Sequence, residues 1–126
     1  MTLTDRVFVY GTLKVGQRNH HLVADLVVAV HLAVLDDHSL WDCGSHPAAR
    51  PAPGSRVDGE VLVLREPREA LRRLDELEEH PDVYRRRRAR VRVGDTSARA
   101  WFYELVQLDA SWTPCGGSWH PADAHR

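Results

Sequence analysis

Residues 67–79 carry the clearest hydrophobic pattern of the chain. Their apolar positions recur at intervals of three and four, which places on one helical stripe Ala70, Leu71, Leu74 and Leu77. Pro67 suits the first position of a helix, where no amide hydrogen is needed. The pattern therefore predicts an amphipathic helix over residues 67–79.

Glu78 is the polar residue that interrupts this apolar stripe. At roughly 100° per residue, its side chain falls about 20° from Leu71, whereas Glu69, Glu76 and Glu79 point the other way. A carboxylate that faces the interior loses hydration, which raises its pKa toward neutrality. Such a group is suited to general base catalysis. The alternative is that the helix frays before Glu78, so that the side chain turns to water.

Other apolar and β-branched segments predict strands. The predicted strands cover residues 6–10, 27–35, 38–41, 57–64, 84–93 and 98–105. Gly94-Asp95 is a turn dipeptide and is expected to join the last two strands in a hairpin. Asn19 is suited to cap a short helix over residues 20–26.

The remaining segments lack periodicity. Residues 42–55 hold three prolines and two glycines and are predicted to form a loop, and residues 106–126 to form a loosely ordered tail. The sequence has no repeat or linker, so residues 1–126 are predicted to form a single domain. Strands in series with two interspersed helices favour an α+β fold around a small, largely antiparallel or barrel-like sheet.

Composition and charge narrow the class of protein. A chain of 126 residues with 43% hydrophobic and 28% charged residues is typical of a soluble globular domain. No apolar run approaches the roughly 18 residues of a membrane span, and no signal peptide opens the chain. We therefore expect a cytoplasmic protein that does not contact membranes. The net charge of −1 gives no overall attraction to nucleic acid.

A run of arginines crosses one predicted strand. Arginines at positions 86, 88, 90 and 92 share one face of residues 84–93, while the other face carries Ala89, Val91 and Val93. This pattern predicts an amphipathic strand with a solvated arginine face, neutralised in part by nearby acidic residues. The alternative is a phosphate-binding strand, although no aromatic residues alternate with the arginines as in single-strand binders.

Two cysteine and histidine pairs raise the question of a metal. Cys43 with His46, and Cys115 with His120, contain the ligand types of a zinc site. The pairs lie far apart in sequence and in segments that resemble loops, so their geometry is unconstrained. We predict separate free thiols and no metal.

The segment after the first predicted strand is a candidate binding loop. Gly11 permits a sharp turn and close approach to a ligand. The backbone amides of Gly11, Thr12 and Leu13 could hold an anion such as a carboxylate. The segment lacks the spacing of a phosphate-binding loop, and a plain strand-to-helix turn explains it equally well.

Several blocks together resemble one family. Four blocks occur in the order typical of γ-glutamylcyclotransferase-like proteins. They are residues 7–20, which contain Y-G-T-L, and residues 57–63, 74–86 and 116–119. The resemblance is closest to the γ-glutamylamine cyclotransferase and AIG2-like branch. It covers nearly the whole chain and implies a small mixed, mostly antiparallel β-barrel with about two flanking helices.

The resemblance also implies a reaction and a site. The reaction converts a γ-glutamyl amine or another γ-glutamylated metabolite to 5-oxoproline and a free amine, through attack of the substrate's own α-amine. The family's catalytic carboxylate falls on Glu78, and its substrate-binding loop falls on residues 10–13, which include Tyr10. Tyr84 and Tyr103 are further candidates to line the pocket or to hydrogen-bond Glu78, although a core role suits each tyrosine as well. We expect a small γ-glutamyl substrate, no cofactor, and a monomer or homodimer.

The sequence departs from the family pattern in two places. Glu79 stands where a glycine usually follows the catalytic glutamate, and residues 43–55 keep only Pro47-Ala48 of the usual pattern. The first departure affects the predicted direction of the Glu78 side chain, and the second affects the predicted identity of the leaving group. The alternative function is a non-enzymatic ligand- or nucleic-acid-binding module on the same fold, which would use the arginine strand of residues 85–92.

Overall fold

The strands of the protein form one mixed sheet that closes on itself. The computed structural model describes residues 4–42 and 44–119, in which six strands are paired. The strands are β1 (Arg6–Val9), β2 (Val27–Asp42), β3 (Pro47–Leu64), β4 (Tyr84–Val93), β5 (Thr96–Leu105) and β6 (Thr113–Gly116). Pairings β1–β3, β3–β2, β2–β4 and β4–β5 are antiparallel, and a parallel pairing of β1 with β5 closes a barrel. The predicted mixed, mostly antiparallel barrel is confirmed.

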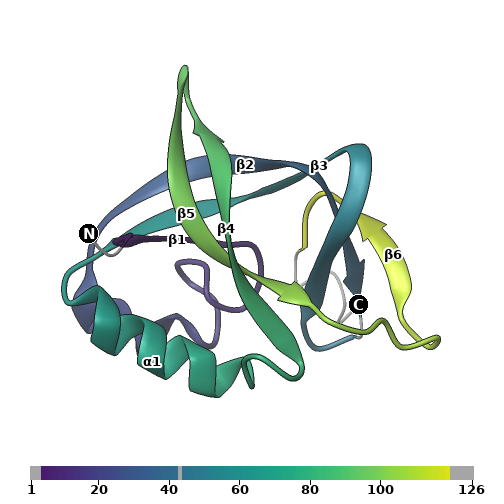
Figure 1. Cartoon of the computed structure of the whole chain (residues 1–126), viewed down its shortest axis with the longest axis horizontal. Coiled ribbons are helices and arrows are strands. Elements are labelled where there is room, and N and C mark those ends of the chain that lie inside the picture. Colours follow the sequence, from purple (N-terminus) through teal and green to yellow (C-terminus); the bar gives the residue numbers. More distant parts are fainter. Residues whose placement is uncertain (1–3, 43, 120–126) are drawn as a thin grey trace.

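The helical part is smaller than the sequence predicts. The described residues form one α-helix, α1 (Pro67–Leu77), which lies along one side of the barrel (Figure 1). The helix predicted over residues 20–26 is instead a pair of 3-10 turns, η1 (His20–Leu22) and η2 (Ala24–Leu26). Asn19 precedes them without a capping hydrogen bond from its side chain.

The long β2–β3 pair corrects two predictions. Residues 27–35 and 38–41 belong to one strand, β2. A register shift at Asp37, where φ is 61°, separates them, and a second shift lies near the start of the strand, between Val27 and Ala29. The loop predicted over residues 42–55 is largely the first half of β3, whose Ala49 pairs with Leu40 of β2. Alanines and prolines give this half no periodic signal, so its pairing is determined by the partner strand and not by local preference.

The C-terminal segment is also more ordered than predicted. Over residues 106–119 the chain forms β6, which pairs antiparallel with the end of β2, and Trp119 is only 3% exposed. The Trp119 indole donates to Asp42 Oδ1 at 3.3 Å. The prediction of a loose tail is therefore wrong for β6 and Trp119, and residues 120–126 lie outside the described part of the chain.

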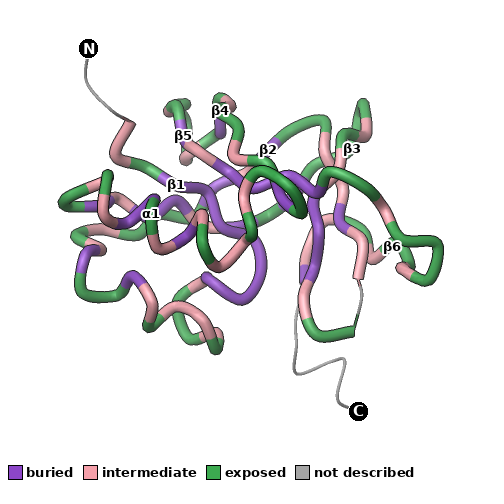
Figure 2. Tube along the Cα trace, turned by 60° about the horizontal axis from the view of Figure 1, so that its bottom comes forward, coloured by how far each residue is buried: buried purple, intermediate pink, exposed green. Residues whose placement is uncertain are grey.

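Strand β1 is buried on both of its faces (Figure 2). Val7 and Val9 pack in a core cluster with Leu74 of α1, while Phe8 packs in a second cluster with Leu35 of β2. Leu74 is fully buried, which for a leucine contributes about 1.5–3 kcal/mol. The helix thus uses the predicted apolar stripe to cover one side of β1 and to bring its C-terminus to the end of that strand.

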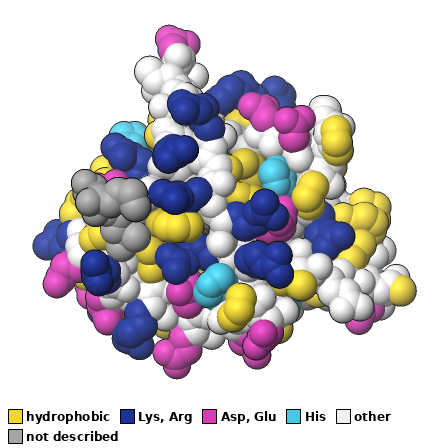
Figure 3. All heavy atoms as spheres, in the orientation of Figure 1, with side chains coloured by type: hydrophobic (Ala, Val, Ile, Leu, Met, Phe, Trp, Pro, Cys, Tyr) yellow, Lys and Arg dark blue, Asp and Glu magenta, His cyan; other side chains and the backbone are white. Residues whose placement is uncertain are grey.

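The arginine strand is solvated in part. Arginine side chains gather on the face of the molecule that carries β4 and β5 (Figure 3). Arg88 and Arg90 are exposed and Val91 is buried, as the alternation predicts. Other arginines form ion pairs: Arg87 with Glu104 at 3.1 Å and Arg92 with Asp36 at 2.7 Å. These pairs reduce the free positive charge of the face. Within the described residues no helix has the length and apolar character to cross a membrane.

Candidate active site

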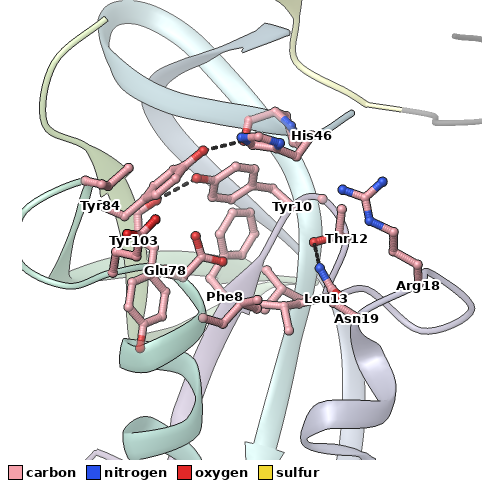
Figure 4. Close-up of a pocket in the computed structure, with 16 residues that line it drawn as sticks. Phe8, Tyr10, Thr12, Leu13, Arg18, Asn19, His46, Glu78, Tyr84 and Tyr103 are labelled. Carbon is pink, nitrogen blue, oxygen red and sulfur yellow. Dashed lines mark hydrogen bonds between the residues drawn. The ribbon is translucent and has the colours of Figure 1, made fainter. Parts of the chain in front are cut away.

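A cavity of about 260 Å³ lies where the end of β1 meets the end of α1 (Figure 4). Its walls also include the start of β4, part of β5 and the turn between β2 and β3. The cavity brings together every residue predicted for the site, namely Tyr10, Gly11, Thr12, Leu13, Glu78, Tyr84 and Tyr103. Pockets for small molecules typically measure roughly 300–1,000 Å³, so this cavity suits a small ligand. The individual roles of these residues stay predictions.

The backbone at the end of α1 keeps Glu78 at the angular position that the helical repeat predicts. The helix ends at Leu77, two residues earlier than predicted, but the Glu78 amide still donates to Leu74 O at 2.9 Å. Glu79 then adopts a left-handed conformation with φ of 52°, and the Tyr84 amide donates to Glu78 O at 3.3 Å. Fraying therefore begins after Glu78. Glu79 makes the turn that a glycine usually makes at this position.

The Glu78 carboxylate has the environment of an acid–base group. The side chain is half-buried and faces the cavity (Figure 4). Burial raises its pKa from 4.5 to about 7. Within residues 4–42 and 44–119 no group hydrogen-bonds to this carboxylate. Near neutral pH the carboxyl group can therefore both accept and donate a proton.

Two of the candidate tyrosines hold the walls of the cavity together. The Tyr10 hydroxyl donates to Tyr103 O at 2.6 Å and accepts from the Ala49 amide at 3.2 Å. Burial raises the pKa of Tyr10 well above its usual value. The Tyr84 hydroxyl donates to Pro47 O at 3.1 Å. These bonds tie β1, β3, β4 and β5 together around the site, so the phenol rings form a preorganised wall.

Tyr103 connects the barrel to the helix that carries Glu78. Its hydroxyl donates to Asp75 Oδ1 at 2.7 Å, and Arg86 Nε forms an ion pair with the same oxygen at 3.1 Å. The Arg86 guanidinium lies 4.5 Å from the centre of the Trp101 ring, a cation–π distance. Burial, followed by the hydrogen bond to Asp75, raises the pKa of Tyr103. Arg86 is thus a bracing residue and not part of a fully solvated face.

The loop after β1 is packed too closely to admit a side chain at Gly11. A Cβ atom there would lie 2.6 Å from Pro47 Cγ. Asn19 stabilises the loop through two hydrogen bonds. Its backbone N–H donates to Thr12 O at 2.9 Å, and its side-chain Nδ2 donates to Thr12 Oγ1 at 3.0 Å. The loop is therefore a fixed turn at the edge of the cavity, with its backbone close to any bound ligand.

Sequence reasoning missed several cavity residues, among them three with polar side chains. Arg18 and Asn19 follow the binding loop, and His46 comes from the turn before β3. Burial, together with the positive charge of Arg18, lowers the pKa of His46, whose ring packs edge-on against Trp112 at 5.5 Å. Arg18 and Asn19 lie inside the first block that resembles the family, which was the available signal. The position of His46 depends on the β2–β3 pairing, which local sequence does not reveal.

The described residues contain no cluster of three or more potential metal ligands. Cys43 and His120, two members of the zinc set considered above, lie outside the described residues. The Cys115 thiol is free and half-buried, and burial raises its pKa to about 11. A thiol with a raised pKa is a poor metal ligand, because binding requires the thiolate.

The protein is a closed mixed barrel, and the helix beside the first strand is followed by a glutamate that faces the cavity. Known proteins share this fold. A crystal structure of an AIG2-like protein from Mus musculus superposes with a TM-score of 0.79 at 27% identity, covering 92% of this chain and 88% of the mouse chain. Residues 7–121 match the family described as gamma-glutamyl cyclotransferase, AIG2-like, and the chain belongs to this family.

Two relatives illustrate the extent of the similarity. A gamma-glutamylaminecyclotransferase from Bos taurus is 40% identical over 94 residues, which cover 68% of this chain but only 55% of the bovine protein. A putative gamma-glutamylcyclotransferase from Vibrio cholerae is 34% identical over 97 residues, covering 77% of this chain and 78% of the bacterial protein.

Proposed function

We propose that this protein is a γ-glutamylcyclotransferase that releases 5-oxoproline and a free amine from a γ-glutamyl amine or a related γ-glutamylated metabolite. The observation that carries the proposal is the Glu78 carboxyl group, held in a small cavity with a pKa raised to about 7. Family membership supports the reaction class, and the relatives named above carry the same activity in their names.

The reaction needs one proton carrier and no redox change. The substrate's α-amine attacks its own γ-carbonyl carbon, a new C–N bond closes the five-membered ring, and the original amide C–N bond breaks. The attacking nitrogen loses two protons as it changes from an ammonium to a ring amide, and the departing nitrogen gains two as it leaves as an ammonium. Glu78 accepts protons from the first nitrogen and donates them to the second. A single carboxyl group with a near-neutral pKa can perform both transfers in sequence.

The remaining contribution is orientation. Because nucleophile and electrophile belong to one molecule, the cavity must hold the glutamyl chain in its cyclising conformation, an effect worth several kcal/mol. The turn at Gly11, Thr12 and Leu13 lines the cavity, and its backbone amides would hold the substrate's carboxylate or the developing oxyanion. The tyrosine wall built by Tyr10 and Tyr84 would limit the motion of the chain.

The direct test is product release from a panel of γ-glutamyl compounds. Purified protein should form 5-oxoproline from at least one member, and a chelator should leave the rate unchanged. A rate that is lost in chelator and restored by zinc would contradict the metal-free mechanism. Inactivity on the whole panel, together with salt-sensitive binding to nucleic acid, would favour the binding module that uses β4.

A further inference from the structure

The cavity is asymmetric in charge. Glu78 lies at the wall formed by the end of α1, whereas Arg18 and His46 line parts of the same cavity that are remote from this carboxylate (Figure 4). Among the described residues that line the cavity, Arg18 is the single permanent cation. A ligand that extends from Glu78 to the exposed side of the cavity at Arg18 therefore meets a positive charge.

The backbone of Arg18 is fixed although its side chain is exposed. The Arg18 carbonyl interacts with His21 Nδ1 at 2.8 Å, and the next residue, Asn19, is bonded to Thr12 through both its backbone and its side chain. The positive charge of Arg18 contributes to the lowered pKa of His46, which places the two groups within electrostatic range of one another. The lowered pKa favours the neutral form of His46.

The Arg18 guanidinium can donate hydrogen bonds to a ligand. Over residues 4–42 and 44–119, the Arg18 side chain forms no ion pair or hydrogen bond, whereas Arg73 pairs with Asp25 at 2.8 Å and Arg92 with Asp36 at 2.7 Å. A guanidinium matches the geometry of a carboxylate, to which it can donate two parallel hydrogen bonds. Arg18 is therefore suited to recognise an anionic group at the mouth of the cavity.

The proposed reaction fixes which half of the substrate reaches this mouth. Glu78 must contact both the attacking α-amine and the departing nitrogen, so the glutamyl half lies between Glu78 and the Gly11 turn. The substituent on the departing nitrogen then extends away from this region, and the cavity residues remote from Glu78 include Arg18 and His46 (Figure 4).

We propose that Arg18 is a specificity-determining residue, which favours γ-glutamyl substrates whose leaving amine carries a carboxylate over those whose leaving amine is neutral or cationic. This inference rests on the function proposed above. A substrate that releases a diamine, by contrast, would bring a second positive charge toward Arg18 and be disfavoured. One charge-assisted hydrogen bond corresponds to a preference of about ten- to a hundredfold.

Three matched substrates test the inference: γ-glutamylglycine, γ-glutamylglycinamide and γ-glutamyl-diaminoethane, whose leaving amines carry an anionic, a neutral and a cationic group. The measurement is kcat/KM for 5-oxoproline release. The unmodified protein should prefer the glycine compound over the glycinamide compound by about tenfold or more. The R18Q variant should lose this preference mainly through KM, and R18E should shift it toward the cationic compound. R68Q, at an exposed arginine of α1 outside the cavity, is the control and should keep it.

Failures of the two proposals are distinguishable. Equal turnover of the three substrates by the unmodified protein would overturn the inference and leave the proposed function standing. A uniform loss of turnover in R18Q, with the preference retained, would mean that Arg18 contacts the glutamyl half of the substrate. That result would also overturn the inference. Absence of 5-oxoproline from all three substrates, and from the wider panel, would overturn the proposed function and this inference with it.

Discussion

The Tyr103 hydroxyl donates a 2.7 Å hydrogen bond to Asp75, which lies about one helical turn before Glu78 on α1. Asp75 also pairs with Arg86 of β4 at 3.1 Å, so one carboxylate joins the helix to two strands of the barrel. Because no described residue hydrogen-bonds to the Glu78 carboxylate, the direction of that side chain depends on the placement of the helix end. The Tyr103–Asp75 contact therefore bears on the geometry of the site without touching the cavity carboxylate.

Replacing Tyr103 with phenylalanine should loosen this attachment. We expect a loss of about 0.5–1.5 kcal/mol in the free energy of unfolding, the usual net value of one hydrogen bond. Turnover should fall as well, but the pKa of the ascending limb of the pH–rate profile should stay in place, because burial is what raises the pKa of Glu78. Urea unfolding and a pH profile measure the two effects. A limb displaced by a full unit would assign Tyr103 a direct electrostatic role.

Gly11 and Pro47 should be coupled. A Cβ atom at Gly11 would lie 2.6 Å from Pro47 Cγ and 2.7 Å from its Cδ, so Gly11→Ala should destabilise the protein by about 1–3 kcal/mol through overpacking. Pro47→Ala removes both contacted atoms. In a double-mutant cycle measured by urea unfolding, the double variant should therefore be more stable than the sum of the single effects predicts. Strict additivity would mean that the cost arises from the Gly11 backbone and not from this contact.

Glu79→Gly should be neutral or stabilising. Glu79 has φ of 52°, a conformation that costs an ordinary residue roughly 1–2 kcal/mol. Glycine removes this strain but loses about 0.5–1 kcal/mol through the greater freedom of the unfolded chain. The net gain should be between zero and about 1.5 kcal/mol, seen as a higher urea midpoint. A clear loss of stability would indicate that the Glu79 side chain makes a contribution that outweighs the strain.

The parts of this structure that sequence predicted are those that local geometry determines. The inward phase of Glu78 follows from the helical repeat that also buries Leu71 and Leu74, and the hairpin of β4 and β5 follows from alternation around Gly94-Asp95. Both signals lie within a few residues of the feature that they predict. The fold class was confirmed for the same reason, because most strands carry their own pattern.

The parts that sequence missed depend on partners distant in the chain. The first half of β3 is a strand because β2 pairs with it, although Pro47 and Pro51 suggest a loop. The same pairing carries His46 to the cavity, and β6 is ordered by its contact with the end of β2. Arg18 was overlooked because an exposed arginine in a turn has no distinctive local pattern.

Glu78→Gln should abolish most of the proposed activity while preserving the fold. The substitution keeps the size of the side chain and removes its acid–base function, so turnover should fall by roughly 10² or more. Glu76→Gln is the matched control, because Glu76 lies on the same helix, is exposed and makes only a 3.5 Å ion pair with Arg72. Rates of 5-oxoproline release measure the difference. Near-normal turnover in Glu78→Gln with loss in Glu76→Gln would show that the helical phase is misassigned.

The same substitution should change how stability depends on pH. The pKa of Glu78 in the folded protein, about 7, lies above its ordinary value of 4.5. Between these values the folded state binds more protons than the unfolded state, so stability falls as pH rises through this window, and the loss is complete above pH 7. Glutamine has no charge to bury, so Glu78→Gln should match the unmodified protein near pH 4 and exceed it near pH 8, by at most about 3 kcal/mol. Urea unfolding of both proteins at the two pH values measures this difference. A difference that is independent of pH would mean that Glu78 titrates normally, and that the cavity does not prepare it for proton transfer.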